Sequence, residues 1–340
     1  MAVFEFLHIS DLHFAQEPGR INLFAQPRSA VKQLVASRTL RPKSADTLSV
    51  RFRDMDSHSI SRTEACARWL HRNRAADRLV IITGDLATSG LREDLEAAYR
   101  ILTQSGSVSV PYLSQRGEPT FAFRPDKCFL MPGNHDRFSD RHGAPGGTNF
   151  DKIFSGFCNL QNGVCAASVA KQGETLHFVA VDFSLRNFEK ITYELQHYGV
   201  GAIAGDTLRA LVDQTEKCVS EAAGPVVWLL HFPPGMHQED SQSEFSIFER
   251  EFMQLIDERV LLDSAERSRI SIVLSGHIHR SIRLKIGELN VVGAGSPTIA
   301  DPYTQGEAHL MRIEVAKGKM TTWSRLDFVH SPDDAEFVQR

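Results

Sequence analysis

Five short segments of the sequence carry Asp, Asn or His side chains, the common protein ligands of first-row divalent metal ions. They are Asp11-Leu12-His13, Gly84-Asp85, Gly133-Asn134-His135-Asp136, His231, and Gly276-His277-Ile278-His279. Each follows a run of apolar residues that reads as a strand. Because ligand sites in open α/β sheets gather at the carboxyl ends of strands, we expect these segments to meet at one edge of the fold.

Two of the segments repeat an i, i+2 spacing of ligands. In an extended backbone, side chains two residues apart point to the same side. Asp11 and His13 are therefore expected to reach one centre, and His277 and His279 are expected to do the same.

The number of ligands indicates how many metal ions bind. The candidates are Asp11, His13, Asp85, Asn134, His231, His277 and His279. One ion with an open catalytic position takes about three to five protein ligands, so this set exceeds one site. Two ions about 3.5–4 Å apart, bridged by a carboxylate, use the whole set, and Asp85 is the expected bridge. Mixed imidazole and carboxylate ligation favours Mn or Fe, with Zn as a further candidate, over Mg or Ca.

Each segment also has an ordinary structural explanation. A single Asp-x-His is usually a surface turn, and a single His in an apolar strand is usually a core or capping residue. A metal centre is favoured because all five segments occur together and each of them follows a predicted strand.

The predicted elements that position these segments alternate between strands and helices, which is typical of an α/β protein. Strands are predicted at residues 3–10, 78–83, 127–131, 175–183, 225–232 and 270–275, and helices at about 62–75, 91–104, 206–222 and 244–262. Further strands at 281–286, 289–292, 309–315 and 320–328 predict a second sheet packed on the first. We expect one domain over residues 1–330, with irregular insertions at about 14–61 and 137–172 and a C-terminal tail at 331–340.

Composition limits the class of protein. Hydrophobic residues make up 42% of the 340 residues, enough for a large core, and the net charge of −4 gives no general attraction to nucleic acid or anionic membranes. The sequence has no apolar run long enough to span a bilayer and no signal-peptide pattern. The five cysteines include no Cys-x-x-Cys pair, so we expect a cytoplasmic protein without a disulfide framework or a thiolate zinc site.

The ordered motifs from Asp11 to His279 resemble those of the calcineurin-like metallophosphoesterases. The resemblance implies a four-layer αββα sandwich, in which two mixed β-sheets pack face to face between helices. It implies that one metal ion takes Asp11, His13, Asp85 and His279, and that the other takes Asp85, Asn134, His231 and His277. His135 is then expected to face the substrate phosphate.

The chemistry expected of such a site is hydrolysis of a phosphate ester. A hydroxide that bridges the two ions attacks phosphorus, and His135 acts as the general acid. Asp136 either orients His135, supports a ligand histidine, or only stabilises the turn. Arg137 and Arg141 follow this loop and are candidates for binding the substrate phosphate, although loop arginines are as often in salt bridges.

Departures from the family patterns narrow the substrate. Thr88 stands where the protein phosphatases of the family carry a second Asp, and Asp136 replaces their Glu, which argues against a protein phosphatase. His231-Phe232-Pro233-Pro234 is similar to the His-His-Pro-Pro of bacterial cyclic-nucleotide phosphodiesterases. We therefore expect a phosphodiesterase for a cyclic nucleotide or a related small molecule.

Three alternatives remain open at this point. They are a nuclease of the DNA-repair type, a phosphomonoesterase, and a non-enzymatic scaffold of the same fold. A nucleic-acid partner is not favoured by the acidic net charge. A scaffold is less favoured because all candidate ligands and His135 are intact. The sequence makes no prediction of the oligomeric state.

Overall fold

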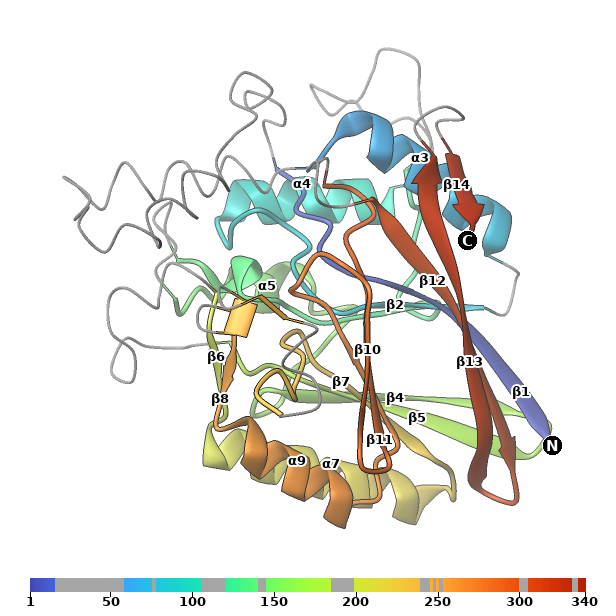
Figure 1. Ribbon diagram of the computed structural model, residues 1–340. Coiled ribbons are helices and arrows are strands. Elements are labelled where there is room, and N and C mark those ends of the chain that lie inside the picture. Colours follow the sequence, from blue (N-terminus) through green and yellow to red (C-terminus); the bar gives the residue numbers. More distant parts are fainter. Residues whose placement is uncertain are drawn as a thin grey trace.

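Two six-stranded sheets form the centre of the computed structural model (Figure 1). The structure describes residues 1–15, 58–74, 78–104, 120–139, 145–184, 199–238, 245–246, 249–250, 253–299, 305–331 and 336–340. Most of the expected insertion at 14–61 lies outside these residues. Among the described residues, no helix has the length and apolar composition needed to cross a membrane.

The first sheet has the strand order β14-β13-β12-β1-β2-β3. Its strands are β1 (Ala2–Ile9), β2 (Leu79–Ile82), β3 (Cys128–Leu130), β12 (Glu307–Ala316), β13 (Lys319–Ser331) and β14 (Glu336–Gln339). β1, β2 and β3 pair in parallel, and β12 joins β1 antiparallel, with Phe6 opposite Met311. The sheet is therefore mixed, and its parallel half ends near the candidate ligands.

The second sheet has the order β10-β11-β9-β7-β5-β4. Its strands are β4 (Val164–Lys171), β5 (Glu174–Val181), β7 (Val226–Leu229), β9 (Ile272–Ser275), β10 (Ile282–Ile286) and β11 (Leu289–Gly293). The four inner strands pair in parallel, and β10 and β4 close the edges antiparallel. A small separate sheet joins β6 (Gly201–Ala202) to β8 (Leu255–Ile256).

The alternation of apolar residues along the strands explains how the sheets pack. In β1, Phe4 and Phe6 face the second sheet, whereas Leu7 and Ile9 face the helices. The Phe6 ring meets the Phe178 ring of β5 edge to face, with centroids 5.3 Å apart. Side chains two residues apart share a face of a strand, so each sheet buries one face against the other sheet.

Helices cover the two outer faces (Figure 1). The described helices are α3 (Ile60–Asn73), α4 (Arg92–Thr103), α5 (Asn149–Ile153), α7 (Gly205–Glu221) and α9 (Glu258–Arg267), with a short 3₁₀ turn η1 (His135–Arg137). Trp69 of α3 packs in the core of the first sheet, and Leu211 of α7 packs in that of the second. The expected four-layer αββα sandwich of two mixed sheets is confirmed.

Four local expectations need correction. The C-terminal strands do not form a sheet of their own, because β12 and β13 extend the first sheet while β10 and β11 extend the second. The expected tail at 331–340 contains β14, where Phe337 is buried against Trp69. The expected insertion at 137–172 contains α5 and β4. The helix predicted at 244–262 is wrong in part, since β8 lies within it and α9 begins only at Glu258.

Candidate metal centre

The candidate ligands lie just beyond the carboxyl ends of parallel strands in both sheets. Asp11 follows β1, Asp85 follows β2 and Asn134 follows β3 in the first sheet. His231 follows β7 and His277 follows β9 in the second sheet. The edge at which parallel strands end is where ligand sites form in such sheets. The site therefore spans both sheets.

The ligand loops have an unusual backbone conformation. Positive φ angles occur at Asp11 (55°), His13 (49°), Asp85 (50°), His277 (73°) and His279 (57°). The expected extended spacing of Asp11 with His13 is thus wrong in its geometry, although the two side chains do converge. The left-handed region costs a non-glycine residue roughly 1–3 kcal/mol and persists where surrounding contacts enforce it. Such conformations cluster at functional sites, and here they coincide with the ligands.

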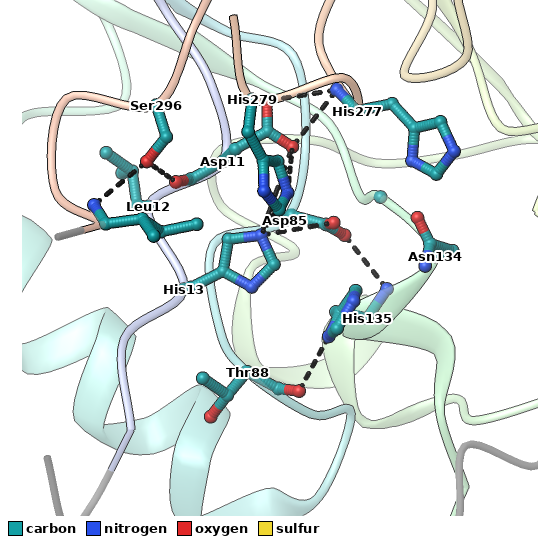
Figure 2. A network of polar contacts seen from close by, with 12 residues as sticks. Asp11, Leu12, His13, Asp85, Thr88, Asn134, His135, His277, His279 and Ser296 are labelled. Atoms are coloured by element: carbon teal, nitrogen blue, oxygen red, sulfur yellow. Dashed lines mark hydrogen bonds and ion pairs between the residues drawn. The ribbon is translucent and has the colours of Figure 1, made fainter. Parts of the chain in front are cut away.

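The first ligand cluster contains Asp11, His13, Asp85 and His279, whose ligand atoms all lie within 4.8 Å of one another (Figure 2). His13 Nε2 lies 3.2 Å from His279 Nε2 and 3.5 Å from Asp85 Oδ2. The distance from His279 Nε2 to Asp11 Oδ1 is 3.7 Å. All four side chains are buried. Together they present two imidazole nitrogens and two carboxylates to one point.

The second cluster shares Asp85 with the first. It contains Asp85, His231 and His277, again with ligand atoms within 4.8 Å of one another. His231 Nε2 lies 3.2 Å from Asp85 Oδ2 and 2.9 Å from Asn134 Oδ1, so the Asn134 amide oxygen belongs to the same group. The shared carboxylate has the position that a bridge between two ions requires.

The donor atoms fit a pair of divalent cations. Among the described residues, the buried atoms Asp85 Oδ2 and His277 Nε2 have no hydrogen-bond partner. A buried carboxylate oxygen or ring nitrogen without a partner is costly, and a metal ion provides that partner. The close approach of His13 Nε2 to His279 Nε2 is likewise the arrangement expected of two ligands of one ion.

Hydrogen bonds to the backbone orient the ligands. His231 donates from Nδ1 to the Thr83 carbonyl over 2.8 Å, which turns Nε2 toward Asp85 and Asn134, where it would bind a metal ion once deprotonated. The backbone N–H of His277 donates to both carboxylate oxygens of Asp11, each at 3.0 Å. The backbone N–H of His135 donates to Asp85 Oδ1 at 2.9 Å, so Oδ2 remains for the cations.

Two hydroxyl residues that hold the first ligand loop were not identified from the sequence. Ser296 donates to the carbonyl of Asp11 over 2.6 Å, and Thr298 donates to the carbonyl of Leu12 over 2.7 Å (Figure 2 shows Ser296). Both lie after β11, where the sequence shows only a glycine-rich passage. The neighbouring Gly293 and Gly295 were the available signal, but they do not indicate which hydroxyl makes the contact.

Glycine is required beside the shared carboxylate. A Cβ atom at position 133 would overlap the side chain of Asp85, and one at position 276 would overlap Ser10 and the Asp11 carboxylate. Real Cβ atoms do not approach other atoms so closely. Gly133 therefore allows the loops after β2 and β3 to pack together, and Gly276 allows the loop after β9 of the second sheet to approach the Asp11 loop of the first.

A comparison with protein families places the chain among known phosphoesterases. The model of the calcineurin-like phosphoesterases matches residues 4–281. The chain belongs to that family. The family consists of metal-dependent phosphoesterases, and the two ligand clusters described above form a possible dinuclear site of the kind its chemistry needs. A comparison with curated proteins finds no match.

Several solved structures are similar to this chain at low identity. GAP50, described as the anchor in the inner membrane complex of Plasmodium, is 10% identical with a TM-score of 0.46, covering 99% of this chain and 87% of that one. A putative 5′-nucleotidase from Staphylococcus aureus is 10% identical with a TM-score of 0.48; the match covers 95% of this chain but only 54% of that one. The phosphopantetheinyl hydrolase PptH from Mycobacterium tuberculosis is 13% identical with a TM-score of 0.42, covering 86% and 89%. At these values the similarity assigns no substrate to this phosphoesterase.

His135 lies beside the first cluster, in the turn η1. Its ring meets the His13 ring edge to face, with centroids 4.6 Å apart. Its Nδ1 donates to the backbone carbonyl of Thr88 over 2.9 Å (Figure 2). Because a carbonyl can only accept, Nδ1 carries the hydrogen of this bond. A backbone carbonyl thus orients the ring where the protein phosphatases of the family have a carboxylate.

Asp136 joins the loops that follow β2 and β3. Its carboxylate accepts backbone N–H groups of Leu86 at 3.1 Å, Ala87 at 2.9 Å and Gly133 at 2.9 Å. Burial, with the nearby Asp85 carboxylate as a second cause, raises the pKa of Asp136 to about 7. Of the three roles considered for Asp136, these contacts favour the stabilising one, because they hold the turns that carry Asp85 and Asn134.

The prediction that Arg137 binds substrate is not supported. Its guanidinium donates to both oxygens of Asp151 at 2.8 Å and from Nε to Asp182 at 2.9 Å, and the residue is only 7% exposed. A bidentate pair of this kind uses the donors that a phosphate would need. Arg137 therefore ties η1 to α5 and to the end of β5. Arg141, the other candidate, lies outside the described residues.

We expect Arg137→Met to act on stability and not on substrate binding. Removal of the cation leaves the buried Asp182 carboxylate without its partner, which costs about 3–5 kcal/mol in the free energy of unfolding. Urea denaturation measures this loss. The control Arg92→Met removes an exposed ion pair on α4 and should leave the urea midpoint unchanged. An Arg137→Met protein of normal stability with a tenfold higher KM would instead make Arg137 a substrate ligand.

Two of the ligands hold protons that a cation must displace. Burial, together with the Asp85 carboxylate, raises the pKa of Asp11 to about 8. Burial opposes the charge on His231, but the Asp85 carboxylate outweighs it and raises the pKa of His231 to about 9. Metal ions bind the deprotonated forms of both groups, so binding releases protons.

Mn²⁺ affinity should therefore rise with pH. Below about pH 8 both groups are protonated, and each proton displaced weakens binding by about tenfold per pH unit. Competition with a chelator of known affinity at pH 6.5, 7.5 and 8.5 measures the slope. An affinity that stays constant over this range would show that neither group holds a proton in the metal-free protein.

Proposed function

We propose that this phosphoesterase hydrolyses a phosphodiester, either a cyclic nucleotide or a related small molecule, with two divalent metal ions. The observation that carries the proposal is the pair of ligand clusters that share Asp85, with His135 beside them. Mn or Fe is the proposed metal and Zn an alternative, because imidazoles and carboxylates are mixed in both clusters.

The ligand residues form two sets, one for each ion. Asp11, His13, Asp85 and His279 would hold one, and Asp85, Asn134, His231 and His277 would hold the other. Once bound, two such cations neutralise charge on the phosphate and lower the pKa of a water molecule, which makes a nucleophile available near neutral pH. The chain itself orients the ligands through Thr83, Ser296 and the backbone of His277.

His135 is the proposed general acid. The Thr88 carbonyl holds Nδ1–H, so Nε2 is the position from which a proton can be given to the leaving oxygen of the ester. His135 is only partly buried, whereas the ligand histidines around it are buried. A proton donor needs that access to substrate, and a ligand does not.

Two features support a diester over a phosphoprotein as substrate. The ring of His135 is oriented by a backbone carbonyl, so the His–carboxylate pair of the protein phosphatases is not formed at Thr88. The segment His231-Phe232-Pro233-Pro234 is similar to that of the cyclic-nucleotide phosphodiesterases of the family. Phe232 takes the place of their second His and packs on the His277 ring, with centroids 4.7 Å apart.

A substrate panel tests the proposal. Metal-free protein is loaded with Mn²⁺, Fe²⁺ or Zn²⁺ and assayed on bis(p-nitrophenyl) phosphate, p-nitrophenyl phosphate, cyclic AMP and single-stranded DNA. We expect the highest kcat/KM on a small diester. A preparation of Asp85→Asn protein, purified in parallel, measures contaminating activity. Cleavage of DNA without turnover of cyclic AMP would make the protein a nuclease, and preference for the monoester would make it a phosphomonoesterase.

A further inference from the structure

Two cysteines of the chain are in direct contact outside the metal centre. Cys158 and Cys165 lie on either side of a tight turn, and their Sγ atoms are 2.7 Å apart. In the turn, Gln161 and Val164 exchange two backbone hydrogen bonds of 2.8 and 3.0 Å. Asn162 and Gly163 between them have φ angles of 52° and 79°, the pattern of a type I′ turn. The turn therefore fixes the distance between the two thiols.

This contact was not expected from the sequence, which predicted no disulfide framework. The other three cysteines lie in separate elements, Cys66 in α3, Cys128 in β3 and Cys218 in α7. Cys158 is 3% exposed, and Cys165 at the start of β4 is partly exposed. Cys165 is thus the more exposed residue of the pair, and the Cys158 thiol is in direct contact with its sulfur.

The turn is connected to the loop that carries His135. The backbone N–H of Asp182 donates to the Gly163 carbonyl over 2.9 Å, and the Asp182 carboxylate accepts from Arg137 Nε over 2.9 Å. Arg137 is the last residue of η1. The turn between the two thiols is therefore connected through Asp182 to the buried ion pair of Arg137, which supports the turn carrying His135.

We propose that Cys158 and Cys165 form a reversible disulfide bond with each other when the protein meets a low-molecular-weight disulfide such as glutathione disulfide. The two thiols already touch, and a bonded pair needs S–S about 2.05 Å, so a small movement is enough. The proposal does not depend on the substrate of the metal centre.

The reaction takes two exchange steps. The Cys165 thiolate attacks one sulfur of glutathione disulfide, forms a mixed disulfide and releases one glutathione thiolate. The Cys158 thiolate then attacks the Cys165 sulfur and releases the second glutathione. The two protein thiols lose two electrons, glutathione disulfide gains them, and the two protons end on the two released glutathione molecules.

The order of attack follows from the environment of the two thiols. Contact with Cys165, followed by burial, raises the pKa of Cys158 well above its usual value. A thiol that is buried and rarely ionised is a poor first nucleophile. It can act second, because the sulfur it attacks is its direct neighbour.

Peptide mapping tests the proposal without any activity assay. Trypsin cleaves after Lys152 and Lys171, so both cysteines fall in the single peptide 153–171. Reduced full-length protein is incubated with excess glutathione disulfide and alkylated after denaturation. We expect the thiol titre to fall from five to three. The peptide should escape alkylation, with a mass about 2 Da below that of its dithiol form, and recover on reduction with dithiothreitol.

Three single variants identify the partners. Cys158→Ala should stop at a mixed disulfide of Cys165 with glutathione, whereas Cys165→Ala should leave Cys158 reduced in the folded protein. Cys218→Ala, the matched control, should form the disulfide as the wild-type protein does. The oxidised wild-type protein should also melt about 3 °C above the reduced protein at equal metal content, because the bond closes a short loop of the unfolded chain.

Either of two results overturns the proposal. One is full alkylation of both cysteines after oxidation of the wild-type protein. The other is a wild-type product that stops at the glutathione adduct of Cys165. Both can be read in the wild-type protein alone, so a variant that fails to fold does not remove the test.

Discussion

Asp85→Asn is expected to remove both metal ions and nearly all turnover. The carboxylate belongs to both ligand clusters, and an amide provides no charged bridge. Loss of this bridge should weaken metal binding more than about 100-fold, and hydrolysis should fall by at least about 10³-fold with it. Metal analysis by mass spectrometry and turnover of bis(p-nitrophenyl) phosphate measure the two effects on one sample.

The substitution is designed to preserve the fold. Asn keeps an oxygen that can accept the backbone N–H of His135, as Oδ1 of Asp85 does at 2.9 Å. Asp213→Asn, at an exposed position of α7, is the matched control and should bind metal normally. Retention of two metal ions per chain by a well-folded Asp85→Asn protein would refute the assignment of Asp85 as the bridge.

His135→Ala is expected to separate catalysis from metal binding. The ring is not a member of either ligand cluster, so metal content should stay at the wild-type level. Loss of the general acid should lower kcat by roughly 10²–10⁴-fold. The loss should be smaller for substrates with good leaving groups, such as p-nitrophenolate, because these need no proton. That dependence on the leaving group distinguishes loss of an acid from a general disturbance of the site.

Thr88→Ala provides the control for His135. The acceptor of the His135 ring is the backbone carbonyl of position 88, which the substitution retains. Turnover should therefore stay within a few-fold of wild type. A loss as large as that of His135→Ala would mean that the Thr88 hydroxyl, and not the carbonyl, supports the reaction. Unchanged turnover in His135→Ala would show that His135 is not the proton donor.

The sequence was most informative where strands end in metal-capable residues. Parallel strands have short apolar runs, and the ligands follow them directly, as Asp11 follows β1 and His277 follows β9. Since the carboxyl ends of such strands converge, the meeting of these groups could be predicted without knowing how the sheets are ordered. The number of candidate ligands exceeds what one ion takes. This count led to the prediction that two ions share a bridging carboxylate and that Asp85 is that carboxylate.

Features set by contacts between distant residues could not be predicted. The ion pairs of Arg137 depend on Asp151 and Asp182. The positions of these two carboxylates are set by α5 and by the end of β5, which the sequence near Arg137 does not reveal. The C-terminal strands divide between the two sheets according to which sheet edge each strand meets. The local sequence pattern is the same for strands of either sheet, so it does not predict this division. The left-handed conformations of the ligand loops are likewise enforced by tertiary contacts, and an i, i+2 spacing does not reveal them.

The position of the site across both sheets has a mechanical consequence. Asp11 and Asp85 extend from one sheet and His231 and His277 from the other, so a pair of ions bound by these residues would cross-link the sandwich at this end. Elsewhere the layers are held by apolar contacts such as that of Phe6 with Phe178, and by a few hydrogen bonds such as those that Glu174 accepts from the backbone of Lys317 and Gly318. With both ions bound, local separation of the layers near the ligands would require their release, whereas separation at the opposite end would not. The supply of cations would govern how often this edge opens, independently of whether substrate is present.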